Sequence, residues 1–304
     1  MHQVSFSRED TDRRVAEFEK HRGRLFGLAY RMLGLQAEAE DIVQEAYLRW
    51  HAADVDSLRT PEAWLVTVAT RLCIDRLRAL QAERRNYVGE WLPEPIVVET
   101  RPSMRPDHAS ELAEDLSIAF LYLLQRLGPE ERAALLLHDV FDCGYPEIAR
   151  VLDKTEVAVR QIVRRARERV RTDRPRFEVT EEKHREMIER FVQAVRTVDE
   201  QALMALFAAD ATWTSDGGGK AAAAINVLRG NEKISKFMAG VARKGREQAG
   251  AVTLKMPRVN GMPALAVYLS GKLFAVYQFV TDGDKIHEVY AVLNPDKLTH
   301  VGEA

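Results

Sequence analysis

Apolar residues recur at intervals of three and four in the first part of the chain, a spacing that predicts amphipathic helices. The run RLFGLAYRMLG places apolar side chains at Leu25, Leu28, Ala29, Met32 and Leu33. The run AEAEDIVQEAYLRWHAA continues as a second amphipathic helix. Thr60-Pro61 opens a third, because proline is favoured in the first helical turn. We therefore predict an all-α domain over residues 12–85.

The periodicity stops after this domain. Four prolines punctuate the next segment, at Pro93, Pro95, Pro102 and Pro106. Proline without hydrophobic periodicity is typical of a partly extended linker, which we place at residues 86–110. Helical patterning resumes near residue 111 and predicts a second all-α domain over residues 111–172.

The second domain contains the pattern of a helix-turn-helix between residues 129 and 171. Thr155 is a predicted N-cap, and the preceding Asp153-Lys154 is the short connection that turns one helix across another. Apolar positions predict the inward face, at Leu135, Leu136, Ile148, Ala149, Leu152, Val157, Val159, Ile162 and Val163. Polar positions predict the outward face, at Arg160, Gln161, Arg164, Arg165 and Arg167.

The outward face of this last helix is strongly basic. Nine Lys or Arg residues lie between Lys154 and Arg176, in a chain whose formal net charge is −2. A helix that enters the major groove reads bases with its first turns and contacts phosphates with its flanks. Arg160 and Gln161 are therefore candidate base readers, and Arg164 either reads a base or binds a phosphate. A solvated arginine-rich surface is the alternative.

Beyond residue 180 the pattern changes to a mixture of helices and strands. It predicts two helices within residues 180–209, a strand near Ala211–Thr214 and a helix from Asn231 to about Lys244. Four runs then alternate as strands, TLKMPRV, ALAVYLS, LFAVYQFV and KIHEVYAVL, separated by Gly-containing turns. We expect a curved antiparallel sheet with helices on one face, forming a cone with a pocket, over residues 180–304.

The composition narrows the class of protein. Hydrophobic residues make up 46% of the chain and charged residues 30%, as in ordinary globular proteins. Cys73 and Cys143 lie far apart, which argues against a disulfide framework and a structural zinc, so we expect no metal and no cofactor. The first residues lack the apolar core of a signal peptide, and no run is long enough to span a membrane. We expect a cytoplasmic protein that does not bind membranes.

Two polar groups in the first domain are candidate binding surfaces. One helical stripe carries Asp41, Gln44, Glu45 and Leu48 and suits a protein partner. The third helix mixes an aromatic residue with polar and basic ones, which suits an unpaired base and its backbone. Its candidates are Trp64, Thr67, Thr70, Arg71, Asp75, Arg76 and Arg78. The alternatives are a solvated face for the first group and a core position for Trp64.

Together these segments resemble the extracytoplasmic-function sigma factors of bacterial RNA polymerase. AEDIVQEAYLRW is similar to the family's core-polymerase-binding segment, PEAWLVTVATRLCIDRLR to its minus-ten-reading helix, and the helix-turn-helix to its minus-thirty-five-reading unit. A subgroup carries a SnoaL-like, nuclear-transport-factor-like domain at the C-terminus. DGGGK at residues 216–220, NPDKL at 294–298 and YVGEWLP at 87–93 are similar to its signature segments.

The resemblance implies the fold class of a multidomain protein: two all-α sigma domains, the second a helix-turn-helix, and a C-terminal α+β cone. It also implies a function, promoter-specific transcription initiation with core RNA polymerase and promoter DNA as partners, and no enzymatic activity. Two positions depart from the family's pattern. Asp153 stands where many relatives have glycine, although aspartate tolerates the left-handed conformation, and Thr70-Arg71 replaces the commoner Arg-Asn.

The resemblance also assigns roles to residues. Asp41, Gln44, Glu45 and Leu48 would bind core polymerase. Trp64, Thr67, Thr70, Arg71, Asp75 and Arg76 would capture the melted strand. Thr155, Glu156, Arg160, Gln161, Arg164 and Arg165 would read the upstream element.

The role of the C-terminal domain is open to several interpretations. We hypothesise that it regulates in cis through two loops that contact the sigma domains or the linker: Asp216, Gly217, Gly218, Gly219 and Lys220, and Asn294, Pro295, Asp296, Lys297 and Leu298. A phosphate loop is disfavoured because the GxxxxGK[ST] spacing is missing.

An enzyme of the isomerase or cyclase type would use Asp216, His287 or Tyr290. However, alternation along a strand puts residues 287 and 290 on opposite faces. A small-molecule ligand in the pocket stays open, as does the alternative function of a polymerase-independent helix-turn-helix regulator that binds duplex DNA alone.

Overall fold

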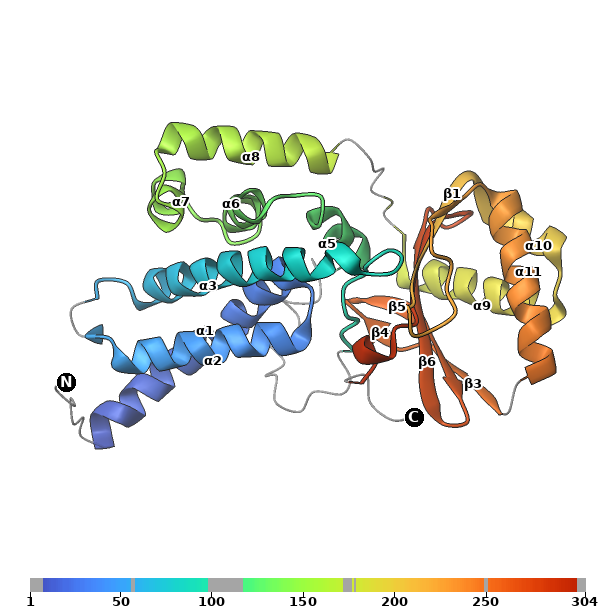
Figure 1. Cartoon of the computed structure of the whole chain (residues 1–304), viewed down its shortest axis with the longest axis horizontal. Coiled ribbons are helices and arrows are strands. Elements are labelled where there is room, and N and C mark those ends of the chain that lie inside the picture. Colours follow the sequence, from blue (N-terminus) through green and yellow to red (C-terminus); the bar gives the residue numbers. More distant parts are fainter. Residues whose placement is uncertain are drawn as a thin grey trace. The chain divides into compact units, whose positions relative to one another are not determined.

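The computed structural model describes residues 8–55, 58–97, 117–171, 177, 179–248 and 251–299 (Figure 1). The chain divides into two compact units. The first contains residues 1–83 and 123–172, and the second contains residues 84–122 and 173–304. The linker segment that precedes residue 98 therefore belongs to the same unit as the C-terminal domain, which the sequence pattern alone does not predict.

The first helical block of unit 1 consists of α1 (Arg8–Leu33), α2 (Gln36–Ala52) and α3 (Pro61–Glu83). The predicted stripe of α1 is its buried face, because Leu25, Leu28 and Leu33 are all 0% exposed. Proline at the first position of α3 confirms the predicted start of that helix. The indole of Trp50 in α2 donates to the Arg14 carbonyl at 3.0 Å, which satisfies the polar end of a buried aromatic side chain.

The helix-turn-helix block of unit 1 consists of α6 (Pro129–Asp139), α7 (Tyr145–Leu152) and α8 (Glu156–Arg171). Side chains of Glu131 and Glu147 accept from the backbone N–H groups of Gly128 and Gly144, both at 3.0 Å, and so close the N-terminal ends of α6 and α7. Asp153 ends α7 with φ +52, the left-handed conformation that the sequence predicts for this turn.

Unit 1 joins its two helical blocks through arginines of one that bind backbone carbonyls of the other. Arg132 of α6 donates to the Met32 carbonyl at 2.5 Å. Arg24 of α1 donates to the Phe141 carbonyl at 2.8 Å. These contacts hold the C-terminal part of α1 against the first turn of α6 and the segment that follows α6. The short helix α5 (Ile118–Leu124) spans the division of the chain, since its first five residues belong to unit 2.

Unit 2 is built on one sheet with helices α9 (Glu181–Thr197), α10 (Glu200–Leu206) and α11 (Asn231–Gln248). Its strands are β1 (Phe207–Asp216), β2 (Leu228–Arg229), β3 (Val252–Lys255), β4 (Arg258–Val259), β5 (Met262–Leu269), β6 (Lys272–Thr281) and β7 (Ile286–Val292). They follow the order β2-β1-β7-β6-β5-β3, with β4 paired to β5.

The predicted strand and turn positions are confirmed, with two corrections. The sheet is mixed, because β1 pairs parallel with β7. Strands joined by tight turns must be antiparallel, but β1 and β7 are separated by α11 and five strands, so the hairpin pattern sets no direction for that pair. The run TLKMPRV forms two strands, β3 and β4, because Pro257 lacks the N–H that a continuous ladder needs.

The two faces of this sheet bury different partners. The face toward α9, α10 and α11 packs aromatic side chains, with the Phe191 ring 5.1 Å from Phe279 and 6.3 Å from Trp213. On the opposite face, Val276, Tyr290 and Val292 of the sheet pack against residues that precede the C-terminal domain in the chain. They include Leu92 and Val97 of the linker and Ile118 and Ala119 of α5. The linker thus completes the core of unit 2.

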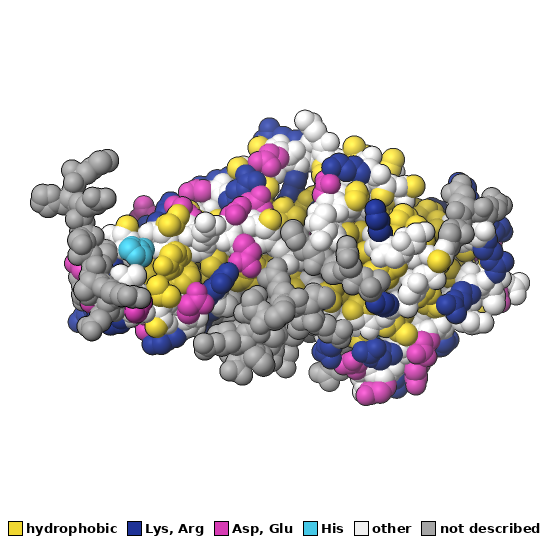
Figure 2. Space-filling view, turned by 90° about the horizontal axis from the view of Figure 1, so that it is seen from below, with side chains coloured by type: hydrophobic (Ala, Val, Ile, Leu, Met, Phe, Trp, Pro, Cys, Tyr) yellow, Lys and Arg dark blue, Asp and Glu magenta, His cyan; other side chains and the backbone are white. Residues whose placement is uncertain are grey.

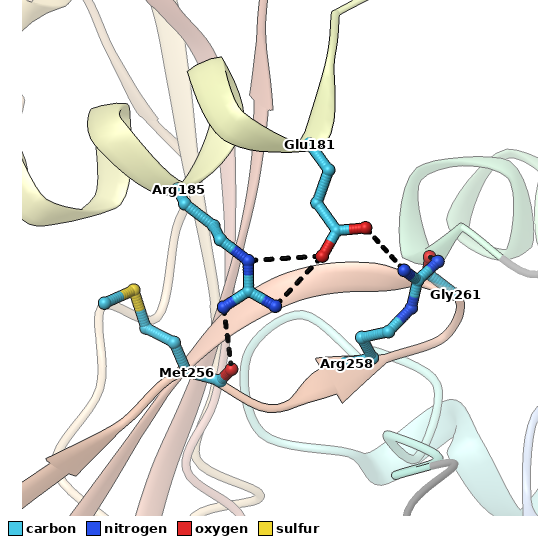
Figure 3. Close-up of polar contacts among 5 residues, drawn as sticks. All are labelled: Glu181, Arg185, Met256, Arg258 and Gly261. Atoms are coloured by element: carbon cyan, nitrogen blue, oxygen red, sulfur yellow. Dashed lines mark hydrogen bonds and ion pairs between the residues drawn. The ribbon is translucent and has the colours of Figure 1, made fainter.

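An ion-pair network holds the first turn of α9 to the loop that carries β4 (Figure 3). Glu181 accepts from Arg185 at 2.9 Å and from Arg258 of β4. The same arginines reach backbone carbonyls, Arg185 that of Met256 and Arg258 that of Gly261. Hydrogen bonding to Arg185, followed by the charge of Arg258, keeps the pKa of Glu181 below its ordinary value. The β4 loop is therefore positioned by α9.

Among the helices that the structure describes, none is long and apolar enough to cross a membrane.

Candidate nucleic-acid interface and linker-binding site

The outward face of α8 is exposed as the sequence predicts. Side chains of Arg160 and Arg164 are 59% and 79% exposed, and Gln161 lies exposed between them. The inward face is formed by Val159, Val163 and other apolar residues. Thr155 accepts from the Ala158 N–H at 3.2 Å and so confirms the predicted N-cap. The first turn of α8 is consequently well defined and presents polar groups.

Partners within the block orient several of these side chains. The Arg160 guanidinium lies over the Tyr145 ring, 4.2 Å from its centroid, and Tyr145 in turn meets the ring of His138 at 4.5 Å. Arg164 pairs with Glu168 at 2.9 Å, and Arg165 donates to the Gln161 carbonyl at 3.4 Å. Exposed pairs of this kind contribute little and exchange readily for a phosphate.

The surface of the molecule is not uniformly basic. On the face in Figure 2, side chains of both charges are interspersed with hydrophobic ones. This agrees with the net charge of −2. Any DNA contact through α8 is therefore local and does not arise from general phosphate neutralisation.

One predicted core residue of α8 is wrong. Val157, which the apolar pattern places on the inward face, is 67% exposed. Val159, also predicted on the inward face, is buried at 0%, and residues two apart lie on different faces of a helix, so both valines cannot belong to the core. Leu152 and Ile162 are half-buried, and the other predicted core residues of the block are buried.

The predicted stripe of α2 lies on the surface. Leu48 is 54% exposed, Asp41 and Gln44 are exposed, and Glu45 is half-buried. Glu45 pairs with Arg49 at 2.8 Å. A large apolar side chain beside polar ones is the composition of a protein-binding surface, because such side chains are normally buried.

The candidate strand-binding residues of α3 do not share one environment. Thr70 is 0% exposed and its hydroxyl donates to the Val66 carbonyl at 2.7 Å, so it supports the helix and cannot contact DNA here. Trp64 is half-buried against Trp50, with ring centroids 5.9 Å apart. Arg76 binds Glu38 through two nitrogens, at 2.5 and 2.6 Å.

The remaining α3 candidates are accessible, but one is engaged by the helix-turn-helix block. Asp75 and Arg78 are exposed and Thr67 is half-buried. Arg71 donates to the carbonyls of Arg150 and Val151, both at 3.0 Å. These carbonyls end α7, where the negative end of the helix dipole favours a cation. In this conformation the guanidinium of Arg71 is therefore used within unit 1.

The two signature loops of the C-terminal domain meet around Asp216, at the end of β1. Its carboxylate is 0% exposed and accepts from Lys297 at 2.6 Å. It also accepts from the linker, from the Tyr87 hydroxyl at 2.5 Å and from the Leu92 N–H at 2.8 Å. We call Asp216, Lys297, Asn294, Tyr87 and Leu92 the linker-binding site.

Lys297, the other member of the ion pair with Asp216, also binds the linker. Its ammonium donates to the Leu92 carbonyl at 2.6 Å and lies 3.8 Å from the centroid of the Trp91 ring. The side chain is 5% exposed. Burial lowers the pKa of Lys297, and the charge of Asp216 opposes that shift. Asp216 and Lys297 therefore hold both the N–H and the carbonyl of Leu92.

Tyr87 links the linker to the second loop. The Tyr87 hydroxyl accepts from the Asn294 amide at 2.8 Å while it donates to Asp216. Burial, and then the hydrogen bond to Asp216, raises the pKa of Tyr87. A phenol that stays protonated is needed here, because a phenolate could not donate to the carboxylate.

The glycines of the DGGGK loop permit this close approach. A Cβ at Gly218, which has φ +58, would lie 2.3 Å from the Asn294 side chain. A Cβ at Gly219, with φ +72, would lie 3.3 Å from the Cβ of Val88 in the linker. On the surface Lys220 pairs with Asp296 at 2.5 Å and joins the two loops. The loop therefore packs tightly against Asn294 and Val88.

A second contact holds the linker further along. The Asn260 side chain accepts from the Ile96 N–H at 3.2 Å, and the Asn260 N–H donates to the Ile96 carbonyl at 2.9 Å. Val97 forms a bridge with Val259 of β4. Asn260 is 1% exposed. The sequence identifies Asn260 only as a turn residue, since an asparagine before glycine is also the usual signal of a hairpin.

The residues considered for catalysis are dispersed. Asp216 is occupied by the linker-binding site, and Tyr290 packs on the face opposite to Val289, as strand alternation predicts. His287 meets Asp282 at 2.7 Å and stacks on Phe177. Among the described residues, no group of three or more His, Cys, Asp or Glu side chains is arranged to hold a metal ion.

Comparison with known proteins gives consistent matches along the chain. The family model of sigma-70 region 2 matches residues 18–83, and that of sigma-70 region 4 matches residues 117–170. The chain is 37% identical over 300 residues to the ECF RNA polymerase sigma factor SigJ of Mycobacterium tuberculosis, covering 94% of this chain and 93% of SigJ. It is 31% identical to SigG of the same species, covering 94% of this chain and 84% of SigG.

The fold agrees with these matches. The crystal structure of M. tuberculosis SigJ superposes with a TM-score of 0.73 at 36% identity, covering 94% of this chain and 98% of that one. The predicted fold class of two helical sigma domains and a C-terminal α+β domain is thereby confirmed. The chain belongs to the extracytoplasmic-function RNA polymerase sigma factors, which bind core polymerase and promoter DNA to initiate transcription and are not enzymes.

Proposed function

We propose that the C-terminal domain regulates this sigma factor in cis by binding the linker between its two DNA-reading blocks. The observation that carries the proposal is the buried Asp216–Lys297 pair, both members of which bind the backbone of Leu92. An ion pair at the surface would not need linker groups. A buried pair has lost its hydration and is stable only when its remaining hydrogen bonds are satisfied. Docking of the linker supplies them.

The linker also fills the outer face of the sheet. Leu92 is 0% exposed and Val97 is 7% exposed, and both pack with Val259, Tyr290 and Val292. Release of the linker would expose this apolar surface, which makes the docked state favourable in water. Polymerase binding supplies the competing free energy. The equilibrium between the docked and the released linker then sets how readily the polymerase is engaged.

The DNA and polymerase contacts are assigned as follows. Asp41, Gln44, Glu45 and Leu48 bind core polymerase. Trp64, Thr67, Arg71 and Asp75 contact the melted strand, whereas the burial of Thr70 and the ion pairs of Arg76 give those two a supporting role. The exposed face of α8 reads the upstream element through Thr155, Glu156, Arg160, Gln161, Arg164 and Arg165.

Strand capture by α3 requires a conformational change in unit 1. Arg71 must exchange the carbonyls of α7 for DNA, so the helix-turn-helix block has to leave α3. Two neutral carbonyl acceptors are exchanged for phosphate, which forms the stronger charge-assisted bond. The separation also breaks the bonds of Arg132 to the Met32 carbonyl and of Arg24 to the Phe141 carbonyl, so binding of polymerase and promoter must offset its cost.

Variants that weaken linker docking test the regulatory proposal in run-off transcription with core polymerase and the full-length chain. Tyr87→Phe removes one hydroxyl that joins Asp216 and Asn294, and Asp216→Asn weakens the contact with Lys297. We expect each to change promoter output by about fivefold or more, a typical size for allosteric coupling. Lys236→Met is the matched control, because it breaks an exposed ion pair of α11 that involves no linker residue.

The proposal is wrong if both linker variants leave output within the range of the control while thermal unfolding shows all proteins folded. Truncation after residue 176 provides a second test, since removal of the whole C-terminal domain must also change output.

A small-molecule ligand is the remaining predicted partner, and it stays a prediction. The aromatic interior of the cone is closely packed, with the Trp213 ring 5.7 Å from Tyr277 and 6.1 Å from Phe237. Regulation through the linker requires no ligand. A thermal-shift screen of the full-length protein tests the prediction, because a ligand that binds only the folded state raises the melting temperature.

A further inference from the structure

Val157 is an apolar side chain at a position where the fold does not use it. It is 67% exposed, the largest exposed fraction among the large hydrophobic residues that the structure describes. The buried face of α8 is already complete without it, through Val159, Val163 and Ala166, each at most 1% exposed. A single exposed valine is ordinary on a protein surface, so a contact is indicated only by where Val157 lies on α8.

The position of Val157 identifies the surface that it belongs to. Residues three, four and seven further along α8 are Arg160, Gln161 and Arg164, and side chains at these intervals lie on one stripe of a helix. All three are exposed. Val157 is thus the apolar N-terminal end of a stripe that is otherwise cationic or polar, in the first turn after the Thr155 cap.

DNA offers one apolar group at the edges of its bases in the major groove, the C5 methyl group of thymine. Phosphates and the other base edges there are polar, and the cations around Val157 match them. The first turn of a recognition helix is also the part that approaches base edges most closely. A protein partner would favour a wider apolar patch, but the exposed neighbours on this stripe are charged or polar.

We infer that Val157 is a specificity residue that contacts a thymine methyl group in the upstream promoter element. The inference rests on the proposed role of α8 in reading that element. It adds a preference for thymine that the arginines and Gln161 cannot supply, because a hydrogen-bonding side chain does not recognise a methyl group.

Replacing thymine by deoxyuridine tests this contact, since the change removes the methyl group and leaves base pairing intact. The full-length protein with core polymerase is bound to a promoter duplex selected from a library randomised upstream, and each thymine of the upstream element is replaced in turn. With the wild-type protein we expect one position at which affinity falls by about fourfold, the effect of one buried methyl group.

The same scan with Val157→Ala gives the decisive comparison. Deoxyuridine at that position should cause no further loss in the variant, whose affinity for the thymine duplex is already reduced. Val157→Thr, which keeps one methyl group, should retain part of the discrimination. Val241→Ala, a half-exposed valine of α11, is the matched control and should behave as wild type.

Two results overturn the inference: no thymine whose methyl group matters, or an equal deoxyuridine effect in wild type and Val157→Ala. Arg164→Ala separates this failure from a failure of the α8 assignment. If Arg164→Ala weakens binding while deoxyuridine has no effect, only the inference on Val157 is wrong. If neither variant nor any substitution in the element changes binding, α8 does not read it.

Discussion

The Asp216–Lys297 pair of the C-terminal domain and the arginine pairs of α8 are ion pairs in opposite environments. Asp216 and Lys297 are 0% and 5% exposed, whereas the side chain of Arg164 is 79% exposed. In water an ion pair forms and breaks at little cost, which suits a side chain that must transfer to a phosphate. Without water the pair needs every hydrogen bond, which suits a site that fixes a chain segment.

Under the proposed function, this difference distinguishes the DNA-binding surface of α8 from the linker-binding site of the C-terminal domain. The arginines of α8 can be replaced without unfolding the protein, and their loss is expected to appear in DNA affinity. Substitutions in the linker-binding site should instead change the free energy of unfolding and the position of the linker.

The largest effect is expected from Asp216→Ala, which leaves the Lys297 ammonium buried without its counter-ion. Loss of one member of a buried pair destabilises by about 3–5 kcal/mol. Urea unfolding of the full-length chain measures it. Asp296→Ala is the matched control, because it breaks the Lys220–Asp296 pair between the same two loops, whose side chains are 57% and 61% exposed. That loss should stay below about 1 kcal/mol, and equal losses would contradict the account.

The next effect concerns the glycines that bring the two loops together. Gly218→Ala should destabilise by about 1–3 kcal/mol through its positive φ, plus the clash of the new Cβ with Asn294. Gly271→Ala measures the effect of the positive φ alone, because Gly271 has φ +81 but a Cβ there would meet nothing within 4 Å. Unfolding midpoints of the two variants give the comparison. A Gly271 variant as unstable as the Gly218 variant would show that the loops tolerate separation.

Arg164→Ala should leave stability within about 0.5 kcal/mol of wild type, since the side chain is exposed. Its loss should weaken promoter binding by the holoenzyme and lower the salt dependence by about one unit in the log–log slope if it contacts a phosphate. Fluorescence anisotropy over a range of salt concentrations measures both. Arg243→Ala, on the exposed surface of α11, should change neither quantity.

The smallest effect is a pH dependence in the turn before β7. Burial alone would raise the pKa of Asp282, but hydrogen bonds from His287 and from the N–H groups of Lys285 and Asp284 outweigh it and lower the pKa to about 2. A lowered carboxyl pKa stabilises the fold above the ordinary value of 3.8 and loses that contribution as pH falls toward 2. Asp282→Ala should therefore differ from wild type at pH 7 and converge with it near pH 2. A difference in the free energy of unfolding between the two proteins that stays constant from pH 7 to pH 2 would contradict a lowered pKa of Asp282.

Much of the fold is predictable from the sequence because the helices and turns are specified locally. The proline that opens α3, the Thr155 cap and the positive φ of Asp153 each follow from nearby residues. The parallel pairing of β1 with β7 does not, because residues 217–285, which contain α11 and five other strands, lie between the two strands in the chain. The hairpins that surround this pair bias the expectation toward an antiparallel sheet.

The linker-binding site is predictable only in part. The two loops and the run that begins at Tyr87 are recognisable segments, but their meeting depends on tertiary structure. Nothing local indicates that Asp216 accepts from the Leu92 N–H or that Asn260 holds Ile96. The core prediction for Val157 is wrong for a related reason. Sequence spacing assigns an apolar helical residue to the core, and only the structure shows that other side chains already fill that core.

The central claim is that docking of the linker on the C-terminal domain controls promoter output. A disulfide that locks the docked state tests it most directly, in a Val88→Cys, Gly219→Cys chain, because a Cβ at Gly219 lies 3.3 Å from that of Val88. Run-off transcription is measured on one preparation before and after reduction, with each single-cysteine chain as control. The account predicts that the lock shifts output in the direction opposite to Tyr87→Phe and that reduction reverses the shift. Identical output from the locked and the reduced protein would contradict it.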